Sequence, residues 1–330
     1  MNAFTQQSPS LMPSDAPFFI IGSSRSGTTL LRLILCGHSR LHIPPETWFI
    51  ADLVARFPLA SALSPEQVRE AVAIMTGHYR WPDMDIPAND LSAAAAALAS
   101  PTLVELIDLP YREHLRRVGK PRFGDKTPPY IGIVPQLLAL YPDARFINLI
   151  RDGRDVAISF VDAHLHSRPY HADFEWRQAV RLAERWRASP HAGRVLDVRY
   201  EDFVREPEPT ARRICEFLGE VFEPAMFAYH ERVALVPERE RWIQQKLVRP
   251  ISADAIGLWR RKLSAFECFC IEASLRADLE RLGYAPRFAA PVWRPPLAAT
   301  AWLLRKLGPL LDVAVPALER RRLLRRVVYL

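Results

Sequence analysis

The sequence is poor in cysteine and lacks long uninterrupted hydrophobic runs. Its four cysteines, Cys36, Cys215, Cys268 and Cys270, are too few and too irregularly spaced for a disulfide framework. Cys268 and Cys270 also lack the two-residue gap of zinc and redox motifs, so we expect reduced, partly buried thiols. Because no stretch approaches the uncharged apolar length of a membrane span, we expect no membrane-crossing helix.

Secretory, nucleic-acid and metal-site signatures are missing as well. Residues 1–17 are polar, with proline and serine, and have neither the basic segment nor the apolar core of a secretory signal. We therefore expect a flexible N-terminus and a cytoplasmic protein. No nucleic-acid motif accompanies the basic residues, which argues against binding of a nucleic acid polymer. Internal repeats and clustered His, Asp or Glu ligand sets are also absent from the sequence, so no metal site is expected.

The composition that remains is that of a folded globular protein with a basic excess. Hydrophobic residues make up 49% and charged residues 25% of the 330 positions, as in ordinary soluble domains. The chain has 44 Lys and Arg against 37 Asp and Glu, a net charge of +7. This excess suits an anionic ligand or an acidic membrane surface and does not choose between them.

Short apolar runs alternate with helical segments along the chain. Buried parallel strands are predicted at residues 18–21, 145–150 and 195–198. Helices are predicted at residues 28–36 (with Gly37 placed to end the helix), from Asp155 onward, and at 210–218. The alternation predicts an α/β fold of the P-loop-NTPase-like, three-layer type, with a central parallel sheet flanked by helices.

The predicted main domain covers residues 18–290. Within it, residues 51–118 read as helices interrupted by prolines, and we expect this insert to lie on the acceptor side; the prolines are Pro58, Pro65, Pro82, Pro87 and Pro101. The tail at residues 291–330 joins an apolar stretch to five arginines, Arg320, Arg321, Arg322, Arg325 and Arg326. A basic amphipathic helix suits peripheral contact with an anionic membrane. The alternative is a C-terminal helix packed on the domain with a solvated basic face.

The segment Gly22-Ser23-Ser24-Arg25-Ser26-Gly27-Thr28-Thr29 lies between a predicted strand and a predicted helix. Its glycine spacing is that of the phosphate-binding loop G-x-x-x-x-G-K-[ST]. Small residues let backbone N–H groups turn toward an anion, and the helix start adds its positive end. Thr28 occupies the lysine position, so the usual contact to the β- and γ-phosphates is missing. Arg25 is the loop's one cation, and with the hydroxyls it predicts a phosphate or sulfonate site.

This loop resembles the 5′-phosphosulfate loop of the sulfotransferases that use 3′-phosphoadenosine 5′-phosphosulfate (PAPS). The second half of that signature is an arginine after a strand and a serine eight positions on, which hold the 3′-phosphate; Arg151 and Ser159 stand in this relation. The resemblance is closest to the tyrosylprotein-type branch and covers residues 18–159 discontinuously, with weaker similarity to Trp259. It implies transfer of a sulfuryl group from PAPS to an acceptor hydroxyl, without a metal.

The resemblance also implies individual roles. Ile43 to Thr47 resembles the Glu-Glu-Thr of that branch and places Glu46 at its catalytic base, while Gly124 to Pro128 places Lys126 at a catalytic lysine. Two further segments place Tyr200 near the nucleotide and Arg249, in place of a lysine, over the cofactor. The implied catalytic residues are Glu46, Arg25 and Lys126. The implied donor-binding residues are Arg25, Ser26, Gly27, Thr28, Thr29, Arg151, Ser159, Tyr200 and Arg249.

Two departures and several alternatives accompany these roles. Pro45 replaces the first glutamate of the acidic pair, and Ala163 stands where a basic residue is expected. The acceptor therefore stays open among peptide tyrosine, carbohydrate, lipid and metabolite, and the sequence does not predict the oligomeric state. Glu46 could instead cap a helix near Thr47, and Lys126 could be a loop cation. The rival functions are a P-loop kinase or NTPase binding Mg-ATP, and a nucleotide-binding protein without turnover.

Other residues near the second motif have simpler expected roles. Asp152 and Arg154 should pair locally. Three histidines, His164, His166 and His171, are expected in solvent, with a catalytic base as the alternative. Three tryptophans, Trp176, Trp186 and Trp259, are expected in the core rather than on an acceptor platform.

Overall fold

The computed structural model describes residues 15–166, 168–169, 173–242 and 245–288. The predicted tail at 291–330, His171 and most of the predicted N-terminal segment lie outside the described residues. The boundaries proposed at residues 17 and 290 therefore stay predictions.

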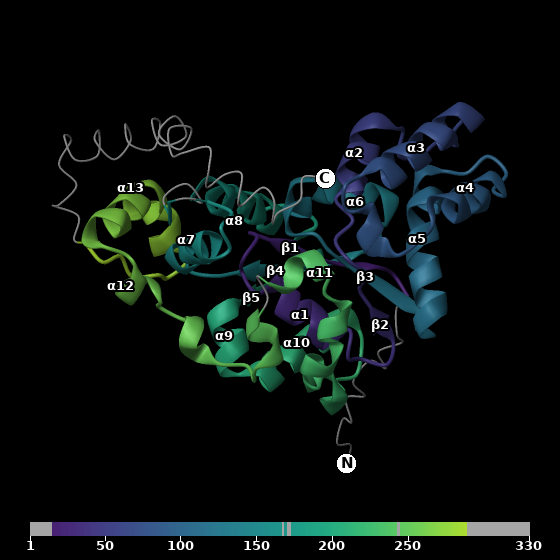
Figure 1. Cartoon of the computed structure of the whole chain (residues 1–330). Helices are drawn as coiled ribbons and strands as arrows, with labels where there is room; N and C mark the ends of the chain where they lie inside the picture. Colours follow the sequence, from purple (N-terminus) through teal and green to yellow (C-terminus); the bar gives the residue numbers. More distant parts are fainter. Residues whose placement is uncertain (1–14, 167, 170–172, 243–244, 289–330) are drawn as a thin grey trace, which may run out of the picture.

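A five-stranded parallel sheet in the order β2-β3-β1-β4-β5 forms the centre of the molecule (Figure 1). The strands are β1 (Phe18–Gly22), β2 (Leu41–His42), β3 (Arg122–Lys126), β4 (Arg145–Ile150) and β5 (Val195–Arg199). In β1, Phe18 lies opposite Gly124 on one side and Arg145 on the other. The predicted α/β fold with a central parallel sheet is confirmed, as are the three predicted strands.

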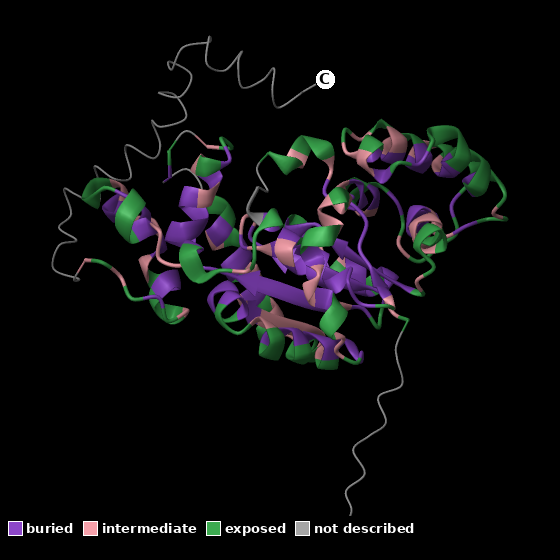
Figure 2. Ribbon diagram, turned by 60° about the horizontal axis from the view of Figure 1, so that its bottom comes forward, coloured by how far each residue is buried: buried purple, intermediate pink, exposed green. Residues whose placement is uncertain are grey.

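Helices cover both faces of this sheet. They are α1 (Thr28–Leu35), α2 (Phe49–Arg56), α3 (Pro65–Gly77), α4 (Ala88–Ala96), α5 (Leu103–Val118), α6 (Val134–Leu140), α7 (Gly153–Asp162), α8 (Asp173–Arg187), α9 (Tyr200–Arg205), α10 (Pro207–Leu218), α11 (Glu238–Arg241), α12 (Trp259–Lys262) and α13 (Ala265–Arg281). Phe19 and Ile21 of β1 pack into one cluster with α2 to α6. Phe18 and Ile20 alternate to the other face and pack with α1 and α10. Strands β1, β2 and β3 are accordingly buried along their whole length, whereas the edge strand β5 is mostly half-buried (Figure 2).

Local signals explain where the helices of the insert begin. Pro65 is the first residue of α3, and Ser64 and Gln67 form a capping box at its start. Thr102 and Glu105 form the equivalent box of α5, directly after Pro101. Pro110 lies inside α5 and is buried, so one proline of the insert does not interrupt its helix.

Several elements were not predicted from the sequence. Strand β3 has the sequence RFGDK, which carries no apolar alternation, yet all five residues are buried. Its charged side chains are accommodated because each finds a partner: Arg122 pairs with Glu220, and Lys126 with Glu46. Helix α13 also escaped prediction, and α7 begins at Gly153, two residues before the predicted start, with the Asp152 side chain as its cap.

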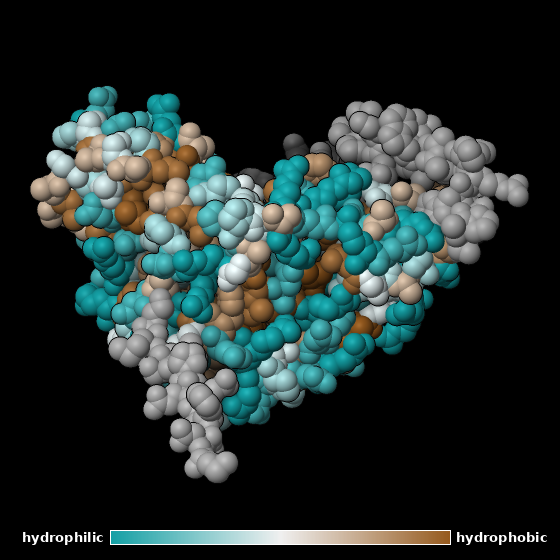
Figure 3. Space-filling view, turned by 180° about the vertical axis from the view of Figure 1, so that it is seen from behind, coloured by the Kyte–Doolittle hydropathy of each residue, from teal (hydrophilic) through white to brown (hydrophobic). Residues whose placement is uncertain are grey.

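The described surface is mostly polar, with hydrophobic residues gathered over the insert at the upper left of Figure 3. All four cysteines are free and buried, as predicted. Among the described residues, no helix combines the length and apolar character that crossing a bilayer takes.

Candidate functional site

The predicted site residues follow the carboxyl ends of the strands. The phosphate-binding loop follows β1, Lys126 ends β3, Arg151 follows β4, and Tyr200 follows β5. Carboxyl ends of parallel strands share one edge of the sheet, so these segments converge there. The chain adds β3 on one side of β1 and β4 on the other. In doubly wound sheets, ligands bind at such a switch point, in a crevice beyond the carboxyl ends of the strands, and the predicted site residues lie at this edge.

The loop between β1 and α1 has the backbone of an anion cradle. Gly27 has φ 94°, and a Cβ atom at this position would lie 2.6 Å from Cδ2 of Tyr200. Arg25 has φ 66°, which is uncommon for a residue with a side chain. The Ser26 hydroxyl is buried and has no hydrogen-bond partner among the described residues. Gly27 is thus required by both conformation and space, and Ser26 offers a donor to a ligand.

Arg25 joins the two halves of the predicted donor site. Its Nε donates to Oγ of Ser159 at 3.2 Å, and its carbonyl oxygen accepts from Nη1 of Arg151 at 3.1 Å. Burial and the neighbouring Arg151 guanidinium lower the pKa of Arg25. Two guanidinium groups held this close repel each other, and a bound anion would relieve that repulsion.

Arg151 is held in place by contacts on several sides. Its guanidinium carbon lies 4.3 Å from the centroid of the Tyr200 ring, and Nη2 donates to the carbonyl of Ala255 at 2.8 Å. Trp176 donates its indole N–H to the Arg151 carbonyl at 2.8 Å. The Nε of Arg151 is buried and unpartnered within the described part of the chain. The Arg151 Nε–H and the Ser26 hydroxyl are both hydrogen-bond donors without an acceptor in the described part of the chain. Both therefore suit a ligand that carries phosphate groups.

Glu46 and Lys126 form an ion pair beside the loop. The Lys126 side chain is 2% exposed, and its Nζ lies 3.5 Å from Oγ1 of Thr29. Lys126 is therefore not an ordinary loop cation. Glu46 does not cap α2 either, because Trp48 is the N-cap residue and no side chain provides the cap hydrogen bond. Thr28, the residue in the lysine position of the loop, is buried at the first position of α1.

The second carboxylate oxygen of Glu46 is also occupied. Trp48 donates its indole N–H to Oε2 at 2.6 Å, and the Arg80 guanidinium lies 3.6 Å from the same oxygen. Burial alone would raise the pKa of Glu46, but Lys126 and Arg80 outweigh it, and the pKa lies below its ordinary value. Glu46 is therefore a carboxylate at neutral pH and able to accept a proton.

A buried polar network lies directly beneath this pair. Oδ2 of Asp125 accepts from the hydroxyls of Thr47 at 2.9 Å and Tyr111 at 2.7 Å, and Thr47 also contacts the Tyr130 hydroxyl at 2.8 Å. Burial raises the pKa of Asp125 to about 6. Since Thr47 follows Glu46 and Asp125 precedes Lys126, the network orients both residues of the pair. Sequence reasoning missed Asp125, although its place beside Lys126 was a usable signal.

Three predicted residues stand apart from this cluster. The Arg249 side chain is exposed, and its carbonyl accepts from the Tyr229 hydroxyl at 2.5 Å. His164 has φ 52° and stacks on Trp242 with ring centroids 5.9 Å apart. His166 lies 3.7 Å from Glu175. A donor role for Arg249 therefore stays a prediction.

The local interpretations of the second motif are confirmed. Asp152 and Arg154 pair at 2.8 Å, and Trp176 and Trp259 are buried. Trp186 is partly buried against the core. No group of three or more His, Cys, Asp or Glu is placed to hold a metal within the residues that the structure describes.

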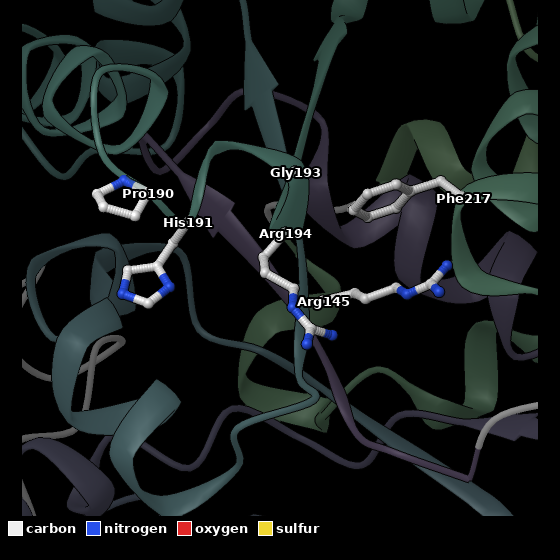
Figure 4. Close-up of a pocket in the computed structure, with 6 residues that line it drawn as sticks. All are labelled: Arg145, Pro190, His191, Gly193, Arg194 and Phe217. Carbon is white, nitrogen blue, oxygen red and sulfur yellow. The ribbon is translucent and has the colours of Figure 1, made fainter.

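A pocket of about 550 Å³ opens at the opposite edge of the sheet (Figure 4). Arg145, at the amino end of β4, and Arg194, just before β5, line it with Phe217. None of the predicted site residues lines this pocket, so it is separate from the predicted site at the carboxyl edge.

Comparison with known proteins supports one family. Residues 17–224 match the family model described as "Sulfotransferase family". Protein-tyrosine sulfotransferase 1 of Danio rerio is 24% identical over 302 residues, covering 87% of this chain and 78% of that protein. An uncharacterized protein of Aquifex aeolicus is 26% identical, and the alignment spans 76% of this chain but only 31% of that longer protein. Among solved structures, the sulfotransferase domain of the Synechococcus PCC 7002 olefin synthase superposes with a TM-score of 0.55 at 26% identity, covering 78% of this chain and 92% of that domain.

Proposed function

This chain belongs to the sulfotransferase family, and we propose that it transfers a sulfuryl group from PAPS to an acceptor hydroxyl through the crevice at the carboxyl edge of its sheet. The observation that carries the proposal is the contact of Arg25 with both Ser159 and Arg151. It joins the phosphosulfate loop to the residues expected to bind the 3′-phosphate. A kinase reading is disfavoured because Thr28 replaces the lysine that contacts β- and γ-phosphates.

In the proposed site, separate groups of residues bind the two anionic ends of PAPS. The loop N–H groups, Ser26 and Thr29 would hold the 5′-phosphosulfate at the start of α1. Arg151 and Ser159 would hold the 3′-phosphate, which distinguishes this donor from ATP. Tyr200 packs against Gly27 and Arg151 and would border the nucleotide.

In the proposed reaction, Glu46 takes the proton of the acceptor hydroxyl. The donor supplies the sulfuryl group: the acceptor oxygen bonds to sulfur as the bond from sulfur to the 5′-phosphate oxygen breaks, and adenosine 3′,5′-bisphosphate leaves. Arg25 and Lys126 supply positive charge for the equatorial and departing oxygens. When Lys126 turns to the sulfonate it releases Oε1 of Glu46, whose basicity then rises. Since these cations belong to the chain, we expect transfer to be unchanged by EDTA.

The acceptor itself is proposed only as a hydroxyl compound. The insert at 51–118 borders Glu46 through Arg80 and is proposed to form part of the acceptor cleft. A peptide tyrosine is one candidate, given the name of the Danio rerio relative, and carbohydrate, lipid and metabolite hydroxyls are the others. A cytoplasmic location is likewise a proposal.

The first test is a thermal titration with adenosine 3′,5′-bisphosphate, alongside Mg-ATP. A ligand that binds only the native state raises the melting temperature, by an amount that grows with its concentration. We expect the bisphosphate to do so, and Arg151→Ala to abolish the effect. Arg145→Ala is the matched control, because Arg145 begins the strand that Arg151 follows, at the opposite edge of the sheet. Stabilisation by Mg-ATP alone would replace the proposal with the kinase reading.

The second test addresses turnover. Glu46→Gln should retain bisphosphate binding and lose at least 100-fold in transfer of radiolabelled sulfate to an acceptor found by screening peptides, glycans and lipids. Transfer at the wild-type rate would show that Glu46 is not the base. Failure of all acceptors with intact bisphosphate binding would favour the nucleotide-binding protein without turnover.

A further inference from the structure

The Glu46 carboxylate has a guanidinium neighbour that no sequence motif indicated. Arg80 lies just before the short 3-10 helix η1 (Trp81–Met84), inside the insert. Its Nη2 is 3.6 Å from Oε2 of Glu46, and both side chains are largely buried, at 15% and 13% exposure. Arg80 is 34 positions from Glu46 in the sequence, so only the packing of the insert against the crevice brings the two together.

Arg80 is shared among three carboxylates: besides Glu46 it contacts Asp83, 3.8 Å from its Nη1, and Glu240. Its Nη1 pairs with Glu240 of α11, whose side chain is 12% exposed. The same helix contributes Arg239, which pairs with Asp83 of η1. Arg239 also donates to the Tyr79 carbonyl at 2.9 Å. Helix α11 is therefore tied by two ion pairs to the part of the insert that touches Glu46.

Charged groups from several elements surround Glu46, and two of them are cations that contact it. The groups that face it or adjoin these neighbours are Arg25 from the loop after β1, Lys126 and Asp125 from β3, Arg80 and Asp83 at η1, Arg239 and Glu240 from α11, His78 next to Arg80, and Asp52 near His78. Lys126 and Arg80 are the two cations in contact with Glu46 itself. If Lys126 turns to the sulfonate in the proposed reaction, Arg80 is the cation left on the base.

We infer that Arg80 is a positioning residue for sulfuryl transfer: it holds the Glu46 carboxylate in its orientation and charge state, and Glu240 competes for the same guanidinium. This inference rests on the proposed role of Glu46 as the base. Because Trp48 and Arg80 contact one carboxylate oxygen and Lys126 the other, release of Lys126 frees the oxygen on the donor side while the opposite oxygen stays held. Helix α11 is then part of the acceptor side of the site, since Glu240 sets how strongly Arg80 binds the base.

Substitutions of Arg80 and of Glu240 should shift the pKa of Glu46 in opposite directions. Removing the Arg80 charge disfavours the Glu46 carboxylate and raises its pKa. Removing the Glu240 charge takes away one of the carboxylates that compete with Glu46 for Arg80, leaving Asp83 as the other, and removes a nearby negative charge, so the pKa of Glu46 falls. A purely structural role would give the two variants the same direction of effect, because either one breaks the same ion pair.

The test is a ¹³C NMR pH titration of the full chain labelled at the glutamate carboxyl carbon, with the Glu46 signal assigned by its loss in Glu46→Gln. We expect an upward shift of the Glu46 midpoint by one pH unit or more in Arg80→Met, a downward shift in Glu240→Gln, and near-normal titration in Arg80→Lys. Arg116→Met is the control, because Arg116 is exposed and pairs with Glu113, which is not among the groups around Glu46. Unchanged midpoints in folded Arg80→Met and Glu240→Gln, or shifts of one sign, would overturn the inference.

The same variants separate this inference from the function on which it rests. In the transfer assay, the acid limb of the rate should move to higher pH in Arg80→Met and to lower pH in Glu240→Gln. If Glu46→Gln transfers normally, the base has been misassigned, whatever the NMR midpoints do. If Glu46→Gln is inactive and the Arg80 and Glu240 variants titrate like wild type, only the role of Arg80 is wrong.

Discussion

At the scale of single residues, the site depends on charged groups taken out of water. Lys126 keeps its place because Glu46 neutralises it, and Asp125 keeps its place through the hydroxyls of Thr47 and Tyr111. Asp125 has no cation of its own in this network, so burial raises its pKa to about 6 from an ordinary value of 3.8. Holding it ionised at neutral pH therefore costs stability.

The Asp125→Asn variant tests this cost. The folded state binds the Asp125 proton more tightly than the unfolded state, so this group makes stability fall as pH rises from about 4 to about 6. The shift of about two pKa units corresponds to about 3 kcal/mol. We expect Asp125→Asn to match wild type near pH 4 and to gain up to about 3 kcal/mol in relative stability by pH 7, measured by urea unfolding at each pH. A difference that does not vary with pH would show that Asp125 has the same pKa in the folded and unfolded states, and would contradict the raised pKa.

At the scale of elements, buried carboxylates dock the late helices. Glu272 of α13 is fully buried and accepts from Arg154 of α7 at 2.6 Å and from the backbone N–H of Arg287 at 2.8 Å. Arg154 in turn lies 3.7 Å from the Trp259 ring centroid. These contacts fix α7, which carries Ser159, so α13 supports the donor site without touching it.

Glu272→Gln should therefore destabilise the fold and loosen the donor site. Breaking one partner of a buried ion pair typically costs about 3–5 kcal/mol, and the amide also presents donors to backbone N–H groups. We expect a loss of about 3 kcal/mol in urea unfolding and weaker bisphosphate binding. Glu280→Gln on the same helix is the control, because its pair with Arg276 is half exposed and worth at most about 0.5 kcal/mol. Equal effects of the two variants would contradict this account.

At the scale of the whole molecule, the predicted site lies between two groups of helices. The insert, with α2 to α5, lies on one side of the sheet, and α7, α12 and α13 lie on the other (Figure 1). The net charge of +7 suits the phosphorylated donor. Part of that charge belongs to the tail, where five arginines are proposed to contact anionic membranes.

The tail proposal can be tested on the full-length chain. Replacing Arg320, Arg321, Arg322, Arg325 and Arg326 by serine removes five positive charges, each worth about 1 kcal/mol near an anionic surface. We expect wild type to sediment with phosphatidylserine vesicles and the variant to stay in the supernatant. The control removes five exposed arginines elsewhere, Arg56, Arg69, Arg112, Arg116 and Arg212, and should still sediment. Identical behaviour of all three proteins would contradict a membrane role for the tail.

The sequence by itself determined the features that depend on neighbours in the chain. Apolar runs predicted β1, β4 and β5 because a buried parallel strand needs little more than such a run. The glycine loop and the Arg151/Ser159 pair could be predicted because each lies within one strand-loop-helix unit, whose backbone geometry depends on residue order. The Asp152–Arg154 pair is similarly local.

The tertiary structure alone decided the features that depend on distant partners. Strand β3 could not be predicted because three of its five residues are charged, which is not typical of a buried strand. In the structure Glu220 pairs with Arg122, Glu46 pairs with Lys126, and the Tyr111 hydroxyl donates to Asp125. The contact of Arg80 with Glu46 likewise appears only when the insert folds back on the crevice. Whether a charge can be buried is set by which other charge meets it in space, and residue order does not specify that meeting.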